Sequence, residues 1–232
     1  MIVNHKYKFI FFKTRKTAGT SIEIALSKFC GDGDIVTRIH KESEPQRQEL
    51  GFRGPQNYDV PLRFYKKLDW LQLLFSQKRK RFRNHSKAQY IKENMCDEIW
   101  NTYFKFCFER NPFDKAISRY YWSTSEPRPK IYDYLSAAQI KYLTNWDIYT
   151  INDQVAADFV GRYENLADDL AVVANKIGIP GPLNLPQAKS GYRQNREHYS
   201  HVLDPQSRAR IELVCAKEIT ALNYAWEDLP KA

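Results

Sequence analysis

The sequence predicts an α/β fold in which helices flank a central parallel sheet. Short aromatic and apolar runs of strand length alternate along the chain with segments whose apolar residues recur at helical spacing. Polar junctions that begin a helix follow the two strongest of these runs, as in parallel sheets covered by helices on both faces. The length of 232 residues suits one domain spanning 1–232, and a hydrophobic content of 43% is enough to form its core.

The first half of the chain begins with a strand, a loop and a helix. Residues 7–12 are aromatic and apolar and predict a buried strand, and residues 20–29 place apolar side chains at a mostly helical period. Residues 35–39 are a candidate second strand. Gly, Pro, Asn and Gln in 42–61 predict a loop or mobile insertion. Residues 62–75 are a candidate helix, and we interpret the apolar stripe at its end as core packing rather than as a membrane anchor.

The second half continues this alternation. Ser86 followed by Gln89 has the capping-box pattern and predicts a helix over 86–95. Residues 103–108 predict the second strong strand, and Pro112 suits the first turn of a helix that runs to Trp122. Further expected elements are a helical zone at 131–143, a strand at 158–163, an amphipathic helix at 164–177 and a last helix from Asp204 to about Leu222.

The formal charge of +9, from 36 Lys and Arg against 27 Asp and Glu, favours a polyanionic partner. Nucleic acid, an acidic membrane surface and a highly charged small ligand all meet that description. The basic run 78–83 suits any of these or an anionic acceptor, although a solvated basic loop is the simpler interpretation. No apolar run approaches the ~20 residues of a membrane span, and residues 1–6 lack the apolar region of a signal peptide, so we expect a cytoplasmic protein.

The first polar junction, residues 13–21, has the composition of a phosphate-binding loop. It follows a strand and begins a helix, so its small residues let backbone N–H groups approach an anion at the helix N-terminus. Three hydroxyl side chains and three cations surround this point, namely Thr17, Thr20, Ser21, Lys13, Arg15 and Lys16. The loop differs from a Walker A loop because Lys16 precedes Gly19. An ordinary strand–helix turn with solvated cations is the alternative interpretation.

The second polar junction follows the predicted strand at 103–108. Arg110 stands at the carboxyl end of that strand, where open α/β sheets bind ligands, and its planar guanidinium suits a phosphate. Ser118 lies two turns into the following helix and is expected to face the same way. A purely structural pairing of Arg110 with Glu109 or Asp114 explains the arginine equally well.

Together the two junctions resemble motifs of the sulfotransferase superfamily, which uses 3′-phosphoadenosine 5′-phosphosulfate (PAPS) as donor. The segment Lys16-Thr17-Ala18-Gly19-Thr20-Ser21 is similar to the first loop of that family, although Arg15 stands where proline is usual. The segment Phe108-Glu109-Arg110-Asn111-Pro112, with Ser118 eight residues after the arginine, is similar to its second motif. Residues 159–166 look like its late strand–helix segment. The nearer match is the branch of carbohydrate (membrane-type) sulfotransferases and their bacterial relatives.

The resemblance implies a P-loop-like sulfotransferase fold and a PAPS-binding site. It implies that the first loop holds the 5′-phosphosulfate, that Lys16 is the catalytic lysine at the bridging oxygen of the leaving phosphate, and that Arg110 and Ser118 hold the 3′-phosphate. The expected donor-binding residues are Lys13, Arg15, Lys16, Thr17, Ala18, Gly19, Thr20, Ser21, Arg110 and Ser118, with Tyr192 and Arg193 in a loop that closes over the nucleotide. Four widely spaced cysteines form no metal-binding motif, so no metal is expected. Residues 41–83 match nothing in the family and predict an acceptor-side insertion.

Sulfuryl transfer to a hydroxyl needs a proton acceptor, and histidine is the natural one near neutral pH. Among five histidines we select His85, because it precedes a predicted helix upstream of the second motif and the resemblance implies a histidine base in this interval. His40 is the fallback, and Glu42 or Glu44 is the backup if the acceptor loop folds over the site. The remaining histidines lie before the first strand or near the nucleotide-closing loop: His5, His198 and His201.

The expected function is in-line transfer of the sulfuryl group from PAPS to a hydroxyl of a soluble acceptor, which is a carbohydrate, a small metabolite or a natural product. N-sulfation stays open, and the oligomeric state is not readable from the sequence. Two other classes remain as alternatives: a P-loop-type nucleotide kinase, which the order of the lysine disfavours, and a basic nucleic-acid-binding module. On the sulfotransferase interpretation, neither a nucleic-acid partner nor a membrane span is expected.

Overall fold

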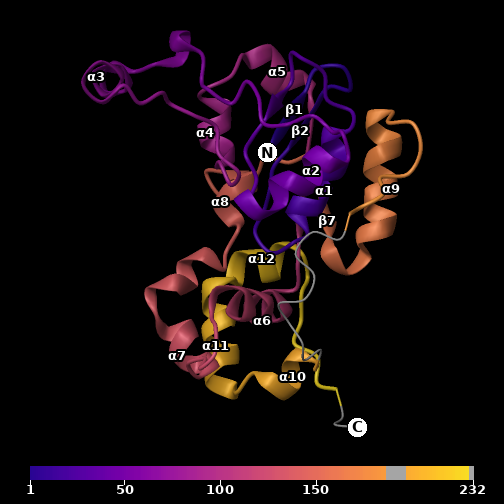
Figure 1. Cartoon of the computed structure of the whole chain (residues 1–232). Helices are drawn as coiled ribbons and strands as arrows, with labels where there is room; N and C mark the ends of the chain where they lie inside the picture. Colours follow the sequence, from indigo (N-terminus) through magenta and orange to yellow (C-terminus); the bar gives the residue numbers. More distant parts are fainter. Residues whose placement is uncertain (187–196, 230–232) are drawn as a thin grey trace.

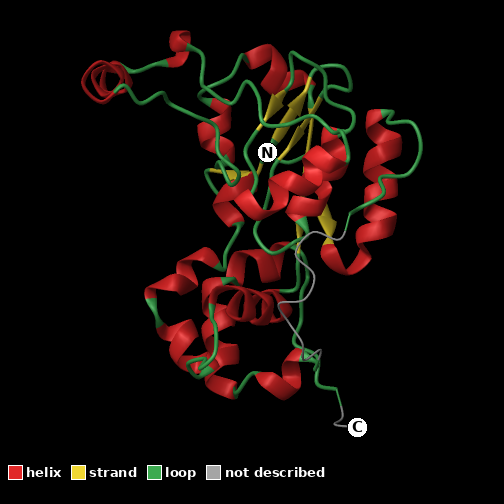
Figure 2. Ribbon diagram, in the orientation of Figure 1, coloured by secondary structure: helices red, strands yellow, loops and turns green. Residues whose placement is uncertain are grey.

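A five-stranded sheet lies at the centre of the fold, in the order β3-β1-β2-β4-β7 (Figures 1 and 2). The computed structural model describes residues 1–186 and 197–229. The strands are β1 (Ile2–Asn4), β2 (Phe9–Phe11), β3 (Ile35–Val36), β4 (Phe104–Glu109) and β7 (Phe159–Arg162). β2, β4 and β7 pair in parallel, whereas β1 pairs antiparallel with both β2 and β3, so four of the five strands run in one direction. The α/β prediction is confirmed, with β1 running against the other four strands.

The sequence prediction missed β1, because three residues are too few to display a strand period. Asn4 ends the strand and holds the turn that leads to β2. Its side-chain oxygen accepts a hydrogen bond from the Tyr7 N–H at 2.8 Å, and its side-chain amide donates to Asp34 at 2.9 Å. Lys8 completes the turn with a positive φ of 49°. This turn places His5 at the edge of the sheet opposite to the carboxyl ends of β2 and β4.

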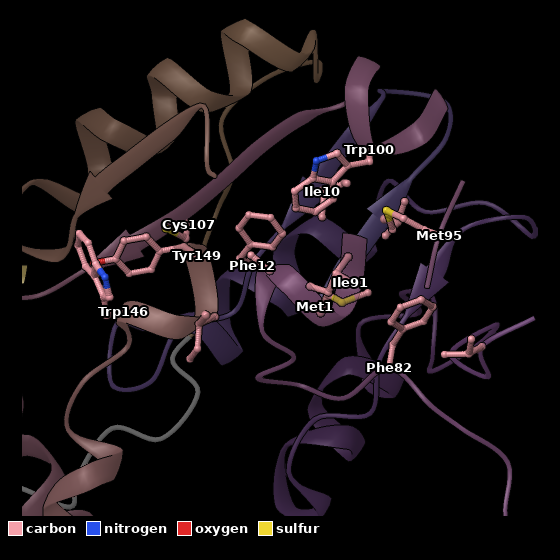
Figure 3. Close-up of a cluster of buried hydrophobic side chains, with 14 residues drawn as sticks. Met1, Ile10, Phe12, Phe82, Ile91, Met95, Trp100, Cys107, Trp146 and Tyr149 are labelled. Atoms are coloured by element: carbon pink, nitrogen blue, oxygen red, sulfur yellow. The ribbon is translucent and has the colours of Figure 1, made fainter. Parts of the chain in front are cut away.

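Both faces of the sheet are buried, because successive residues of a strand point to opposite sides. Ile10 and Phe12 belong to a cluster on one face, which Figure 3 shows together with Trp100 and other side chains. Phe9 and Phe11 belong to the cluster on the other face, which packs against α1 (Gly19–Ser27) and α9 (Leu166–Ile177). The continuous apolar run of the first predicted strand therefore reflects burial on two sides.

The other helices form two groups and one outlying element (Figure 1). Those around the sheet are α2 (Glu44–Glu49), α4 (Ala88–Lys92), α5 (Asp97–Thr102) and α8 (Trp146–Tyr149). Those beyond its carboxyl edge form a helical layer with a core of its own: α6 (Pro112–Ser123), α7 (Ile131–Ser136), α10 (Tyr199–Val202), α11 (Pro205–Val214) and α12 (Ala216–Ala221). The outlying helix is α3 (Lys67–Ser76). Among the described helices, none is long and apolar enough to cross a membrane.

The remaining elements are short. They are the 3₁₀ turns η1 (Lys41–Ser43), η2 (Leu62–Phe64), η3 (Ala138–Tyr142) and η4 (Tyr163–Asn165), and the hairpin of β5 (Thr150–Ile151) and β6 (Gln154–Val155). The predicted last helix is present but divides into α11 and α12 at Cys215. Its start is confirmed, because the Asp204 carboxylate accepts a hydrogen bond from the Ser207 N–H at 2.6 Å.

Three local predictions are wrong. The region 42–61 is not only loop, since α2 forms there around a hydrogen bond of 3.0 Å from buried Arg47 to Glu44. Ser86 does not cap a helix, because its hydroxyl accepts from the Arg83 N–H and α4 begins two residues later. The apolar stripe of α3 is not core packing, because no residue of this helix is buried.

Candidate active site

The first loop connects β2 to α1 at the carboxyl edge of the sheet, and its backbone is unusual. Lys16 and Ala18 both have positive φ, of 64° and 58°, which non-glycine residues adopt only when the surrounding structure holds them there. A Cβ on Gly19 would meet Lys13 Cγ at 3.0 Å and the Thr14 carbonyl oxygen at 3.1 Å, so a larger residue here would push the loop outward. The loop leads directly into the N-terminus of α1, where the first backbone N–H groups have no acceptor within the helix.

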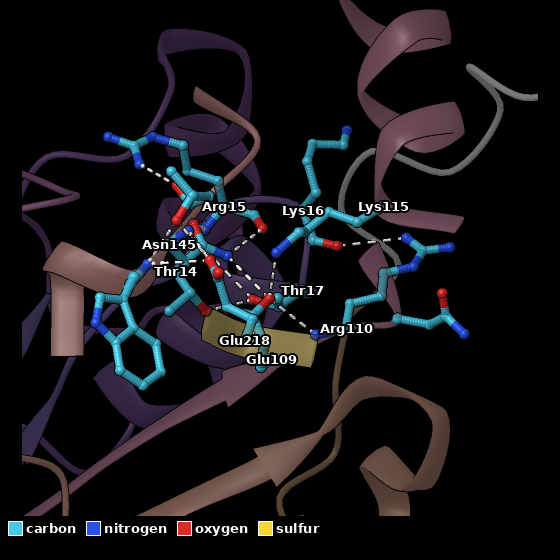
Figure 4. A network of polar contacts seen from close by, with 12 residues as sticks. Thr14, Arg15, Lys16, Thr17, Glu109, Arg110, Lys115, Asn145 and Glu218 are labelled. Atoms are coloured by element: carbon cyan, nitrogen blue, oxygen red, sulfur yellow. Dashed lines mark hydrogen bonds and ion pairs between the residues drawn. The ribbon is translucent and has the colours of Figure 1, made fainter. Parts of the chain in front are cut away.

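Side chains from distant parts of the sequence fix the shape of this loop (Figure 4). The Thr14 hydroxyl donates to the carbonyl oxygen of Phe108 and is 2.7 Å from the Thr17 hydroxyl, which therefore points into the protein. Asn145, which is 1% exposed, holds the backbone of Arg15 from both sides. Its Oδ1 accepts from the Arg15 N–H at 2.9 Å, and its Nδ2 donates to the Arg15 carbonyl oxygen at 3.2 Å. The loop is thus fastened both to β4 and to the segment before α8.

Two buried carboxylates hold Asn145 in place. Glu109 accepts from Asn145 Nδ2 at 3.1 Å and pairs with buried Lys115 at 2.7 Å. Glu218 of α12 accepts from the Asn145 N–H at 2.9 Å and from the Thr144 hydroxyl at 2.6 Å. Burial alone would lower the pKa of Lys115, but Glu109, together with Cys215 and Glu218, raises that pKa above its ordinary value. Sequence reasoning missed Asn145 and Glu218, because each is a single polar residue outside any motif.

Replacing Asn145 with alanine is expected to lower the free energy of unfolding by about 2–4 kcal/mol, because the Arg15 N–H and carbonyl oxygen lose their hydrogen bonds to Asn145 and buried Glu109 loses one of its donors. Urea unfolding followed by circular dichroism measures this loss. The matched control is Asn165→Ala, whose amide makes an exposed contact with Asp169 and should change stability by less than about 0.5 kcal/mol. Equal effects of the two substitutions would contradict a clamping role for Asn145.

The structure brings the two sequence motifs together. Arg110 Nη1 donates to the Lys16 carbonyl oxygen at 3.3 Å, across 94 positions of sequence. The Arg110 side chain is 12% exposed, and its guanidinium carbon lies 4.1 Å from the centre of the Tyr163 ring. It also donates through Nε and Nη2 to Asp114, so the structural pairing considered from the sequence is present as well. Arg110 therefore lies against the first loop while an acidic partner orients it.

Lys16 and Ser118 lie along the same side of α6. Lys16 Nζ is 5.2 Å from the centre of the Trp122 ring. Ser118 lies one helical turn after Asp114 and one turn before Trp122, so the three side chains share a face of the helix. Since Arg110 contacts the loop at one end of this face and Trp122 approaches Lys16 at the other, Ser118 borders the same space.

Two of the expected donor-binding cations are used inside the protein. Lys13 Nζ pairs with Glu23 Oε2 of α1 at 2.7 Å, and both side chains are buried. The Arg15 guanidinium donates to the Thr144 carbonyl oxygen at 3.4 Å and lies 5.7 Å from the Tyr142 ring, facing away from Lys16 (Figure 4). The sequence analysis expected both side chains at the donor, and the donor site proposed below includes neither of them. The other two residues expected at the nucleotide, Tyr192 and Arg193, lie outside the described residues.

His85 contacts the start of the first loop. Its Nδ1 is 2.7 Å from the carbonyl oxygen of Lys13, and because a carbonyl only accepts, Nδ1 carries the proton and donates. In the neutral ring the lone pair then resides on Nε2. Burial lowers the pKa of His85 to about 3, and the nearby cations Lys13 and Arg15 shift it in the same direction. The ring is therefore uncharged at neutral pH, and its unprotonated nitrogen is fixed in orientation by the loop.

The other candidate bases are bonded elsewhere. His40 is 49% exposed and lies 3.6 Å from exposed Glu42, and Glu44 is engaged by Arg47. The remaining three histidine rings also have hydrogen-bond partners: His5 bonds to Tyr103, His198 to Ser200 and His201 to the carbonyl oxygen of Leu229. Among the histidines, all of which the structure describes, His85 is the one that touches the first loop.

Comparison with known proteins places these motifs in a family. A family model described as "Sulfotransferase family" matches residues 1–146, which include the first loop, His85, Arg110 and Ser118. A protein of Archaeoglobus fulgidus described as an uncharacterized protein is 35% identical over 104 residues, which cover 42% of this chain and 87% of that protein. No solved structure matches the chain. Since the family match covers well over half of the sequence and both motifs of the site, this chain belongs to the sulfotransferase family, whose members transfer sulfuryl groups.

Proposed function

We propose that this chain transfers the sulfuryl group of PAPS to a hydroxyl of a carbohydrate, a small metabolite or a natural product. One observation carries the proposal: the guanidinium of Arg110 hydrogen-bonds the carbonyl of Lys16. The resemblance assigns these residues to opposite ends of the donor, the 3′-phosphate and the 5′-phosphosulfate. Their contact supports a single site at the carboxyl edge of the sheet, where ligands of open α/β folds bind.

The backbone of the first loop suits the 5′ end of the donor. The close approach at Gly19 and the left-handed conformation of Lys16 and Ala18 direct the loop into the N-terminus of α1. There the N–H groups of 17–21 and the hydroxyls of Thr20 and Ser21 would hold the phosphosulfate oxygens. The Thr17 hydroxyl is turned inward toward Thr14, so we assign to Thr17 only its backbone N–H.

The other end of the donor would lie along α6. Arg110 supplies charge and two-point hydrogen bonding, and Ser118 supplies a hydroxyl one turn beyond Asp114. Asp114 keeps Arg110 oriented but also competes with a phosphate for its guanidinium. The donor therefore has to share Arg110 with this carboxylate, which favours a dianionic phosphate over a neutral ribose hydroxyl.

The roles of Lys16 and His85 follow from charge and hydrogen bonding. PAPS supplies an activated sulfuryl group whose bond to the bridging oxygen breaks as a new bond forms to the acceptor oxygen. Lys16 would stabilise negative charge on the departing phosphate. Nε2 of His85 would accept the proton of the acceptor hydroxyl, while the bond from Nδ1 to the Lys13 carbonyl fixes the tautomer that leaves Nε2 unprotonated. Residues 41–83, which end two residues before His85, we assign to the acceptor side.

Binding of adenosine 3′,5′-bisphosphate tests the donor assignment without knowledge of the acceptor. At a hundredfold excess over Kd it should stabilise the protein by about 2.7 kcal/mol, visible as a rise in Tm, and ATP should stabilise it far less. Duplex DNA serves as a third ligand. Stabilisation by ATP but not by the bisphosphate would indicate a kinase-type site and overturn the proposal.

Ser118→Ala should weaken binding of the bisphosphate about 10- to 150-fold, because a hydrogen bond to a charged group contributes about 1.5–3 kcal/mol. Binding of adenosine 5′-phosphate, which lacks the 3′-phosphate, should be unchanged. Isothermal titration of both nucleotides gives this ratio. The matched control is Ser123→Ala on the same helix, whose hydroxyl bonds within the helical layer to Arg119 and Tyr134. Equal loss of both nucleotides in Ser118→Ala would argue against a 3′-phosphate contact. Turnover of labelled PAPS with a panel of hydroxyl compounds would then identify the acceptor.

A further inference from the structure

One segment leaves the body of the protein as an arm. We call residues 61–79 the α3 arm. Its two ends are closed by an antiparallel bridge between Asp59 and Arg81. The Val60 N–H donates to the Lys80 carbonyl oxygen at 2.8 Å, and the Phe82 N–H donates to that of Tyr58 at 2.8 Å. Figure 1 shows α3 at the far end of this arm, apart from the sheet and from the helical layer. The arm is therefore a projection with a defined base.

Contacts within and beside the arm give it a fixed fold. The Asp69 carboxylate accepts from the Lys66 N–H at 2.9 Å and from Lys80 Nζ at 2.7 Å. The Tyr65 hydroxyl accepts from the Lys80 N–H at 2.8 Å, and its ring meets that of Trp70 with centroids 5.5 Å apart. These contacts use one side of α3, so its opposite side is presented outward.

The outward side of α3 is apolar. Leu68, Leu71 and Phe75 stand at positions i, i+3 and i+7 and form one stripe, with Leu74 beside it. Leu68 is 78% exposed, Leu74 73% and Phe75 83%. Burying such a side chain is worth about 1.5–3 kcal/mol, so four of them on one short helix form a surface that gains free energy when it is covered. We call these four side chains the apolar stripe.

Positive charge surrounds the apolar stripe. Residues 63–83 contain one acidic and eight basic residues, a net charge of +7, compared with +9 for the whole chain. Asp59 and Glu93, which pair with Arg81 and Lys66, reduce this only to +5. Basic residues occur at both ends of the helix, at Lys66 and Lys67 where it begins and at 78–81 after it. The excess charge of the protein is thus concentrated where its apolar surface is most exposed.

We propose that the α3 arm docks on the surface of a lipid bilayer that contains anionic lipids. The apolar stripe enters the headgroup region, and the flanking lysines and arginines contact lipid phosphates. A helix that combines Leu, Phe and Trp with adjacent basic residues is typical of segments that lie in this interface. A second copy of the chain fits less well, because pairing two arms would bring together two surfaces of the same strong positive charge. The docking does not depend on the transfer reaction.

Co-sedimentation of the full chain with vesicles tests the proposal. Binding is expected to vesicles of phosphatidylcholine and phosphatidylglycerol in equal amounts, and much weaker binding to phosphatidylcholine alone. The double variant L68Q/L74Q should lower the partition coefficient more than tenfold, since both side chains are highly exposed and the fold should tolerate their replacement. Its matched control is V172Q/L213Q, which removes two exposed apolar side chains from α9 and α11 and should change binding less than twofold.

A second pair of variants tests the charge. K67Q/K78Q should weaken binding roughly 30-fold, because each basic residue near an anionic surface contributes about 1 kcal/mol. K41Q/K176Q removes the same charge elsewhere and should have little effect. Circular dichroism melting verifies that each variant is folded. Three results would overturn the proposal: no binding of the wild-type chain to the anionic vesicles, equal losses in the arm variants and their controls, or self-association that L68Q/L74Q abolishes without vesicle binding.

Discussion

Replacement of Lys16 with methionine is expected to lower kcat about 10²–10³-fold, the usual cost of removing one group that stabilises charge in a transition state. Methionine keeps most of the side-chain length that packs toward Trp122 and removes only the ammonium. Glycine is unsuitable as a probe here, because at a positive φ of 64° it would also relax the backbone of the loop. Steady-state turnover of PAPS with the identified acceptor gives the measurement.

The same variant separates catalysis from binding. Because the proposed role of Lys16 concerns charge that develops on the leaving phosphate, Lys16→Met should change the Kd for adenosine 3′,5′-bisphosphate far less than it changes kcat. Lys28→Met, at the other end of α1, is the control for charge and should keep full turnover. A kcat within a few-fold of the wild-type value in Lys16→Met would remove Lys16 from the mechanism while leaving the donor site intact.

His85→Asn is expected to lower kcat about 10²–10⁴-fold, the range contributed by a positioned general base. Asparagine is chosen because its amide N–H can replace the bond from Nδ1 to the Lys13 carbonyl, so the first loop stays anchored while the basic Nε2 is lost. Binding of the bisphosphate should be nearly unchanged. His40→Ala, on an exposed side chain, provides the control and should leave turnover intact. Full activity of His85→Asn would exclude His85 as the base.

The pH profile gives an independent check on His85. Since its pKa is lowered to about 3, the neutral and basic form predominates at all pH values above that, and protonation removes it only as the pH falls toward 3. Turnover should therefore show no acidic limb near 6.5, the ordinary value for histidine. A limb near 6.5 that disappears in His85→Asn would contradict the lowered pKa of His85.

The sequence predicted those parts of the fold that rest on local patterns. Phe104–Glu109 and Pro112–Ser123 follow from an apolar run, a polar break and a proline suited to a first helical turn. The predicted cap at Ser86 is wrong because its hydroxyl accepts a hydrogen bond from the Arg83 N–H, which precedes it, and the capping-box pattern considers only the residues that follow. The apolar residues of α3 were interpreted as core, since amphipathic spacing reveals that a helix has an apolar side and not what covers it.

The sequence predicted that the two motifs would lie together, but not that Asn145 and Glu218 would hold the first loop in place. Lys16 and Arg110 lie in contact because each stands at a strand–helix junction, and junctions of parallel strands meet at one edge of the sheet. Lys13 was assigned to the donor, whereas the structure pairs it with Glu23, because a cation beside a phosphate-binding loop looks the same in sequence whether it faces a ligand or a buried carboxylate. Glu23, set between Ile22 and Ile24 in α1, was the available signal, since an acidic residue in an apolar helix face implies a buried partner.

The hydrogen bonds from Asn145 to the first loop also bear on how much of the chain is needed for activity. The family match ends at residue 146, just after Asn145, yet Asn145 is itself held by Glu218 of α12, 73 positions further on. A fragment that ends at residue 146 would contain both motifs and His85. It would lack Glu218, the carboxylate that accepts the hydrogen bond from the Asn145 N–H. We therefore expect a fragment that ends at residue 146 to lose the shape of the first loop, because that shape depends on a hydrogen bond to α12.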